Sequence, residues 1–132
     1  MKIAVLITTF NRVFETNKCL KSLNKLNLKL DIFIADSNSD KVPEISIFKN
    51  LNIQIFNVGD DIYWNQGMNK SWEKAVKNFK YDFYLWLNND TFLYKNAFEI
   101  IFKDYYSLGE DAIIVGITEY NSKITYGGRH HL

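Results

Sequence analysis

Short apolar runs alternate along the chain with stretches in which apolar side chains recur at every third or fourth position. The apolar runs cover residues 3–8, 31–35, 53–58, 82–87 and 112–117. Runs of this length, rich in β-branched and aromatic residues, are typical of buried strands. The three- and four-residue spacing predicts helices over residues 13–26, 65–79 and 96–106. A short helix is expected to begin at Pro43, and residues 118–132 are polar and predicted to be irregular.

Strands that are apolar throughout and separated by helices predict an α/β fold, with a mostly parallel central sheet and helices on both faces. In such sheets, ligands bind beyond the carboxyl ends of the strands. The first four predicted strands are each followed by a polar segment: TFNR (residues 9–12), DSNSD (36–40), GDD (59–61) and NNDT (88–91). Three of these segments carry carboxylates, and all four are expected to converge on one edge of the sheet.

Composition narrows the class of protein. At 132 residues the chain is the size of one domain, and its 47% apolar content argues against disorder. The formal charge is +1 with mixed signs, so a basic face for nucleic acid is not expected. No apolar run reaches the length of a membrane span, and residues 1–10 lack a signal-peptide cleavage site. A single cysteine, Cys19, excludes an internal disulfide and fits the cytoplasm.

Several common chemistries find no motif in the chain. Neither GxGxxG nor GxxxxGK[ST] occurs, which argues against a dinucleotide-binding or P-loop site. His130-His131 has no partner cluster for zinc and is expected to lie in a solvated tail. GxSxG is absent, and Cys19 falls within a helix with no histidine near it in sequence, so no nucleophile for hydrolysis is found.

The segment Asn88-Asn89-Asp90-Thr91 has two interpretations. It can be a turn that caps the next helix, because Asn and Asp favour turns and caps. It can also deliver oxygen ligands to a hard cation such as Mg²⁺ or Mn²⁺, with Asp90 as the carboxylate and a diphosphate supplying further ligands. The tetrapeptide alone does not decide between them, and by itself it favours the turn.

Five segments in order resemble a known family. TTFNR, ADSNSD, GDDIYWNQGMNKSW, DFYLWLNNDTFL and TYGG together resemble family 2 glycosyltransferases of the GT-A fold, in the branch that builds bacterial capsule and lipopolysaccharide chains. The resemblance covers nearly all 132 residues. It implies a metal-assisted, inverting transfer of sugar from a UDP-, dTDP- or GDP-sugar to a glycan or lipid-linked acceptor, at the inner face of the membrane. It also implies Mn²⁺ or Mg²⁺ as cofactor.

The resemblance assigns roles to individual positions. The implied nucleotide-sugar-binding residues are Thr8, Arg12, Asp36, Ser37, Asn69, Asn88, Asn89, Asp90, Gly127 and Gly128. The resemblance implies that Thr8, Asp36 and Ser37 contact the base and ribose of the donor nucleotide. It also implies that Arg12 lies near a phosphate. Asn69 falls in the segment that opens the family's third helix, where the helix N-terminus would favour the donor's negative charge.

The remaining roles concern the cation and the sugar. The DXD position reads Asn88-Asn89-Asp90, so its first acid is an amide. Asp90 and Asn88 are the implied metal residues, Asp90 as direct ligand and Asn88 in contact with ribose or a metal-bound water. Gly127-Gly128 would lie near the donor sugar or acceptor.

Simpler structural interpretations stand beside these roles. Residues 36–38 can form an Asx-turn, Arg12 can be a solvated surface side chain, and Gly127-Gly128 can be a flexible turn. Tyr63 and Trp64 are expected to be core aromatics.

The resemblance also indicates what residues 1–132 lack. Inverting transfer needs a general base, and family members carry it beyond the point where this sequence ends. Residues 1–132 are therefore expected to be a single nucleotide-sugar-binding domain that is incomplete at its C-terminus. The alternative function is a binding module without turnover. Uncovered apolar surface predicts self-association into a homo-oligomer, or marginal stability.

Overall fold

The computed structural model describes residues 1–109 and 111–126 of the chain. They belong to two compact units, Met1–Leu93 and Tyr94–Leu132. Within the described ranges, no helix is long and apolar enough to cross a membrane. The predictions for Gly127, Gly128 and the His130-His131 pair lie outside the described residues.

The first unit is built on a four-stranded parallel sheet. Its strands are β1 (Ile3–Thr9), β2 (Leu30–Asp36), β3 (Leu51–Asn57) and β4 (Phe83–Trp86). They lie in the order β3-β2-β1-β4, and every neighbouring pair is parallel. In this register Ile3 of β1 pairs with both Leu30 of β2 and Phe83 of β4.

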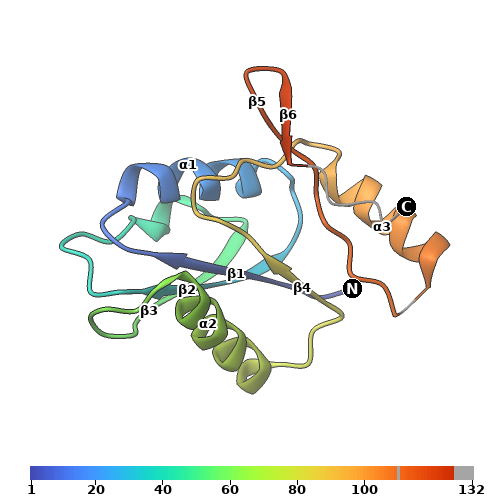
Figure 1. Ribbon diagram of the computed structural model, residues 1–132. Helices are drawn as coiled ribbons and strands as arrows, with labels where there is room; N and C mark the ends of the chain where they lie inside the picture. The colour runs from blue at the N-terminus through green and yellow to red at the C-terminus, as the bar shows by residue number, and fades with distance from the viewer. Residues whose placement is uncertain (110, 127–132) are drawn as a thin grey trace. The chain divides into compact units, whose positions relative to one another are not determined.

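Helices cover both faces of the sheet, which confirms the predicted fold class. Helix α1 (Val13–Asn24) lies on one face and α2 (Trp64–Asn78) on the other (Figure 1). Ala4 and Leu6 of β1 pack with Met68 and Ala75 of α2, whereas the intervening residues of β1 point to the side of α1. The residues of α1 with no exposed surface are Thr16, Cys19, Leu20 and Leu23.

Some details of the helices differ from the sequence predictions. On α2 the buried face contains Ser71 between Met68 and Ala75, while Trp72 is 38% exposed. The spacing of three and four residues centres that face on Ser71 and leaves Trp72 at its border, where it stacks on Tyr84 of β4. The expected helix at Pro43 is a single 3₁₀ turn, η1 (Ile45–Ile47).

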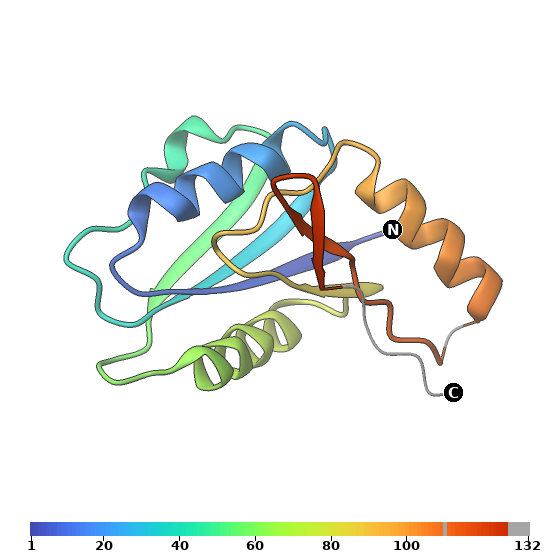
Figure 2. The ribbon, with the colours of Figure 1, turned by 45° about the horizontal axis from the view of Figure 1, so that its top comes forward.

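The chain reverses its direction across the sheet between β1 and β4. From β1 it steps to β2 and β3 on one side, and α2 then returns it to β4 on the other side of β1. Such a reversal leaves a crevice at the carboxyl ends of the two strands, where ligands bind in open parallel sheets. In Figure 2 the segment after β4 turns back toward α1, and the Leu93 N–H donates to the Ser22 hydroxyl at 3.3 Å.

The second unit corrects two predictions. It contains α3 (Ala97–Leu108) and an antiparallel hairpin of β5 (Thr118–Tyr120) and β6 (Lys123–Tyr126). The strand predicted over residues 112–117 is wrong: these residues pair with no strand among the described residues, and Ile113 is 93% exposed. An apolar run becomes a strand only where a neighbour takes its backbone hydrogen bonds. Residues 118–126 are not irregular, because Asn121 and Ser122 both have the positive φ of a type I′ turn.

Candidate functional site

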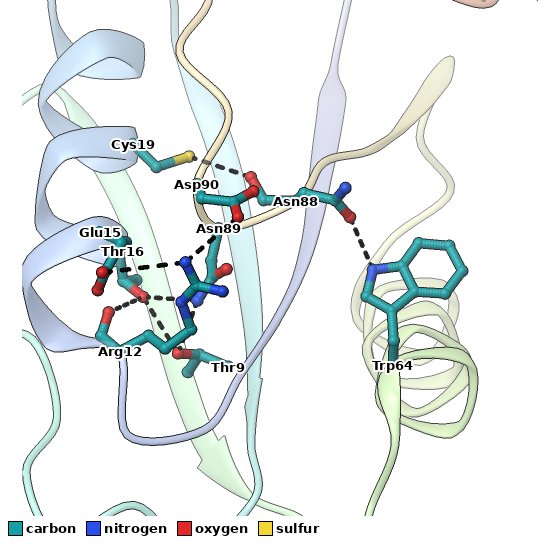
Figure 3. A network of polar contacts seen from close by, with 9 residues as sticks. All are labelled: Thr9, Arg12, Glu15, Thr16, Cys19, Trp64, Asn88, Asn89 and Asp90. Atoms are coloured by element: carbon teal, nitrogen blue, oxygen red, sulfur yellow. Dashed lines mark hydrogen bonds and ion pairs between the residues drawn. The ribbon is translucent and has the colours of Figure 1, made fainter. Parts of the chain in front are cut away.

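A buried polar network joins the ends of β1 and β4. The Asn89 amide is buried, and its Nδ2 donates to the hydroxyls of Thr9 at 3.1 Å and Thr16 at 3.3 Å (Figure 3). Those two hydroxyls lie 3.1 Å apart, and Thr16 Oγ1 donates to the carbonyl of Arg12 at 2.8 Å. The network ties the segment after β4 to the start of α1. Asn89 therefore points inward and holds its two neighbours, Asn88 and Asp90, at the surface.

Asp90 faces a guanidinium. Arg12 Nη2 lies 3.3 Å from Asp90 Oδ2 and 3.9 Å from Glu15 Oε1, and both members of the closer pair are about half exposed. Exposed ion pairs of this kind contribute about 0–1 kcal/mol, so Arg12 can be exchanged for another cation at little cost. No three His, Cys, Asp or Glu side chains gather as a metal site in residues 1–109 and 111–126.

Asn88 is held by an aromatic side chain from α2. The indole Nε1 of Trp64 donates to Asn88 Oδ1 at 2.8 Å. Trp64 is half exposed and Tyr63 is 76% exposed, so the prediction that they are core aromatics is wrong. Both precede the buried part of α2, which begins at Gly67, and this position leaves them at the rim.

Cys19 lies beneath the same segment. Its thiol is 3.8 Å from the carbonyl of Asn88. Burial, and then the negative charge of Asp90, raise the pKa of Cys19 to about 12. A thiol with this pKa stays protonated at neutral pH, and the thiolate is the reactive form. The cysteine therefore packs under the site and supplies no nucleophile.

Asp36, at the end of β2, is buried in its own loop. Its Oδ2 accepts from the Ser39 N–H at 2.9 Å and its Oδ1 from the Ser39 hydroxyl at 2.6 Å. Ser37 Oγ donates to the carbonyl of Gly59 at 3.0 Å and accepts from the Ile62 N–H at 3.3 Å. Ser37 therefore joins the loops that follow β2 and β3, while the Asp36 carboxylate stabilises its own loop.

Further hydrogen bonds connect the loop after β1 to that after β2. Asn11, with φ of 48°, receives the Asp40 N–H on its Oδ1 at 2.9 Å, and its own N–H donates to Ser39 Oγ at 2.8 Å. Thr9 is the centre of the arrangement. Its carbonyl accepts from the Ser37 N–H at 2.9 Å, and its hydroxyl accepts from Asn89. The segments that contain Asp36 and Asp90 thus lie on either side of one residue of β1.

Thr8 and Asn69 lie along the same edge. Thr8 Oγ1 donates to the carbonyl of Ala35 at 3.2 Å, and Gly67 of α2 packs directly against the Thr8 side chain. Asn69 lines an open hollow of about 340 Å³ with Ile62, Asn65, Gln66 and Lys70. Its amide donates to Glu73 Oε1 at 3.2 Å. Asn69 therefore faces the hollow beside α2, while the Thr8 side chain lies between β2 and the start of α2.

The structure brings most of the predicted residues of the first unit into one hydrogen-bonded edge. Sequence reasoning missed four residues that build it: Thr9, Thr16, Trp64 and Gly67. The one available signal was that Thr9, Trp64 and Gly67 lie inside the quoted segments TTFNR and GDDIYWNQGMNKSW. The role of Thr16 depends on a contact across 73 residues of sequence, which no local pattern reveals.

Comparisons with known proteins agree with this fold. A family model described as glycosyl transferase family 2 matches residues 4–132. No curated protein sequence gives a match. The crystal structure of S. aureus TarS residues 1–349 is similar at 17% identity and a TM-score of 0.61, over 78% of this chain and 32% of that one.

The same TarS fragment has also been solved with ligands. Its complex with UDP-GlcNAc is similar at 17% identity and a TM-score of 0.60, over 78% of this chain and 30% of that one. Its complex with UDP is similar at 19% identity and a TM-score of 0.57, over 78% of this chain and 31% of that one. This chain spans about a third of the length of these structures. At such identity the likeness concerns the fold, and it confirms the predicted GT-A type.

Proposed function

The chain belongs to glycosyl transferase family 2, and from this we propose that it binds a nucleotide-diphosphate sugar for inverting transfer to a glycan or lipid-linked acceptor. The observation that carries the proposal is the convergence of polar strand ends at the point where the strand order reverses. Ligands bind at this point in open parallel sheets. The capsule and lipopolysaccharide branch remains the setting that we propose for the reaction.

Asp36, Ser37 and Thr8 are proposed to hold the base and ribose. Each carboxylate oxygen of Asp36 accepts one hydrogen bond from Ser39, and a carboxylate oxygen can accept two. Asp36 therefore has capacity left for an imide N–H or a ribose hydroxyl, and its turn fixes the carboxylate in place. The turn and the binding role are compatible.

A hard cation, Mn²⁺ or Mg²⁺, fits the oxygen donors near the end of β4. Asp90 offers a half-exposed carboxylate that Arg12 already pairs with, so positive charge is accommodated there. In the proposal Asp90 is the direct ligand, and Asn88 contacts ribose or a metal-bound water. The cation, when bound, would offset the negative charge of the departing diphosphate, whose oxygens would complete its coordination. Arg12 is then free to approach a phosphate.

The other predicted residues keep narrower roles. Asn89 is proposed to hold Asn88 and Asp90 in position from the protein interior, because its amide is already hydrogen-bonded there to Thr9 and Thr16. Asn69 is proposed to contact the donor from the N-terminal part of α2, which favours negative charge. Gly127 and Gly128 remain proposed for the sugar or acceptor.

Calorimetry with UDP and Mn²⁺ tests the binding half of the proposal. UDP is the first nucleotide to try, because the similar TarS fragment was solved with UDP. We expect Asp90→Ala and Asp36→Ala to weaken binding at least about tenfold, as loss of a charged hydrogen-bond or metal partner does. Asp104→Ala, on the exposed surface of α3, is the matched control and should bind as the wild type does. Circular dichroism checks that each variant is folded.

Full-strength binding by both site variants would overturn the assignment of the site. Turnover is tested separately, by release of UDP from a UDP-sugar with and without candidate acceptors. Acceptor-dependent release supports transfer by this chain. Binding without release supports the alternative function, a nucleotide-sugar-binding module.

A further inference from the structure

The hydrogen bond between Trp64 and Asn88 has a direction that chemistry fixes. An indole N–H can only donate, so the atom of Asn88 that faces it must be the amide oxygen. The amide nitrogen, with its two N–H groups, is then turned away from the indole, as Figure 3 shows. This nitrogen donates no hydrogen bond to the residues that the structure describes.

Trp64 is itself held at this position by other rings. It makes an edge-to-face contact with Trp86, with ring centroids 6.0 Å apart. Trp86 contacts Trp72 edge to face at 5.8 Å, and Trp72 stacks on Tyr84 at 4.7 Å. This row of four rings joins the start of α2 to β4, and Trp86 precedes Asn88 by two residues. The indole is therefore fixed relative to the residue whose amide it orients.

We propose that Trp64 is a positioning residue: it selects the orientation in which Asn88 donates N–H to an oxygen of the nucleotide diphosphate. An Asp at position 88 would be an acceptor only and would meet the donor's oxygens with repulsion unless a cation lay between them. The amide thus serves a different purpose from an acid at the same place: it binds the nucleotide while Asp90 faces the cation. This inference rests on the proposed function and narrows it, since it gives Asn88 a diphosphate oxygen as its partner in place of ribose or a metal-bound water.

A double-mutant cycle tests the inference by calorimetry with UDP. Trp64→Phe keeps a ring against Trp86 but removes the N–H, so the amide of Asn88 can rotate. We expect UDP binding to weaken about fivefold, the effect of one net hydrogen bond. In an Asn88→Ala background the same Trp64→Phe change should have no further effect. Trp72→Phe, in the same row of rings but without this hydrogen bond, is the matched control and should bind as the wild type does.

Two further readouts separate the outcomes. In the ligand-free chain, Asn88→Ala should move the indole N–H resonance of Trp64 in a ¹⁵N-HSQC spectrum, because its acceptor is gone. Asn88→Asp should weaken UDP binding without metal and make it more dependent on Mn²⁺.

Additive losses in the cycle, or an unchanged Trp64 resonance, would overturn the inference. If the wild type binds UDP but Trp64→Phe binds equally well, this inference fails alone. If the wild type and both Asp variants bind no nucleoside diphosphate, the proposed function fails.

Discussion

Tyr81 places a phenol in the interior between two polar side chains. Its hydroxyl donates to Asp31 Oδ2 at 2.6 Å and accepts from Asn78 Nδ2 at 3.0 Å, and Asp31 also accepts from Asn52. Burial, and then the hydrogen bond to Asp31, raise the pKa of Tyr81 from its ordinary value of 10.0 to about 12. The folded chain therefore keeps this proton at a pH where the unfolded chain has lost it.

The first prediction follows from that difference. Stability should be insensitive to Tyr81 below about pH 10 and should fall between about pH 10 and 12, because there the native state binds more protons than the unfolded state. A shift of this size corresponds to a loss of about 2–3 kcal/mol. Urea unfolding at stepped pH measures it. Tyr81→Phe should be less stable than the wild type at pH 7, but its free energy of unfolding should fall less between pH 10 and 12. If that free energy falls as steeply in the variant as in the wild type, the prediction is contradicted.

Arg12 gives a second prediction at the scale of the residue. Because it pairs with Asp90 at 3.3 Å, it competes with any cation for that carboxylate. Arg12→Ala should tighten the binding of Mn²⁺ alone about two- to fivefold, which matches the range of exposed ion pairs. Electron paramagnetic resonance measures free Mn²⁺ directly. Lys70→Ala breaks a different exposed pair, with Glu73 at 3.7 Å, and should leave Mn²⁺ affinity unchanged.

The element that depends most on a single small residue is α2. At Gly67 the helix approaches β1 so closely that an added Cβ would lie 2.7 Å from the Cβ of Thr8. Ser71, one turn later, donates to the carbonyl of Ile7 at 2.9 Å. These two contacts set the distance between the start of α2 and the end of β1, on which the position of Trp64 depends.

Gly67→Ala should therefore destabilise the chain by about 1–3 kcal/mol, as overpacking of a tight contact does. Gly116→Ala is the matched control, since a Cβ there meets no atom within 4 Å, and its effect should stay within about 0.5 kcal/mol. Thermal unfolding followed by circular dichroism compares the two. Equal melting temperatures for both variants would show that α2 can move away from β1 without cost.

At the scale of the whole molecule, the edge of the four-stranded sheet matters for association. Strand β4 lies at that edge, and its outer side pairs with no strand among the described residues. Its residues Tyr84 and Leu85 are only partly buried, and Trp86 is 43% exposed. An apolar edge of this kind is a template for pairing with another chain. Self-association therefore stays a prediction. Sedimentation velocity over a wide range of concentrations should show a rising weight-average mass, and a constant monomer mass would contradict it.

Much of the fold could be predicted from periodicity, and the reason is physical. Leu6, on the side of α2, and Ile7, on the opposite face of the sheet, are both fully buried, so β1 carries a continuous apolar signal. The run 112–117 carries the same signal, yet it pairs with no strand in the part of the chain that the structure describes, because pairing is not encoded locally. For the candidate site, the sequence could predict only the convergence of the strand ends, which include the segments of Asp36 and Asp90. The contacts of Thr16 and Trp64 depend on tertiary packing, which a single sequence does not reveal.

The row of rings along α2 and β4 contains every tryptophan of the chain, since the sequence has three: Trp64, Trp72 and Trp86. Intrinsic indole emission from this protein therefore originates entirely from this row, and one of its members, Trp64, is hydrogen-bonded to Asn88. Ligand binding at the candidate site can be followed by tryptophan fluorescence without any added label. Quenching by a soluble agent would report how far a bound ligand shields Trp64.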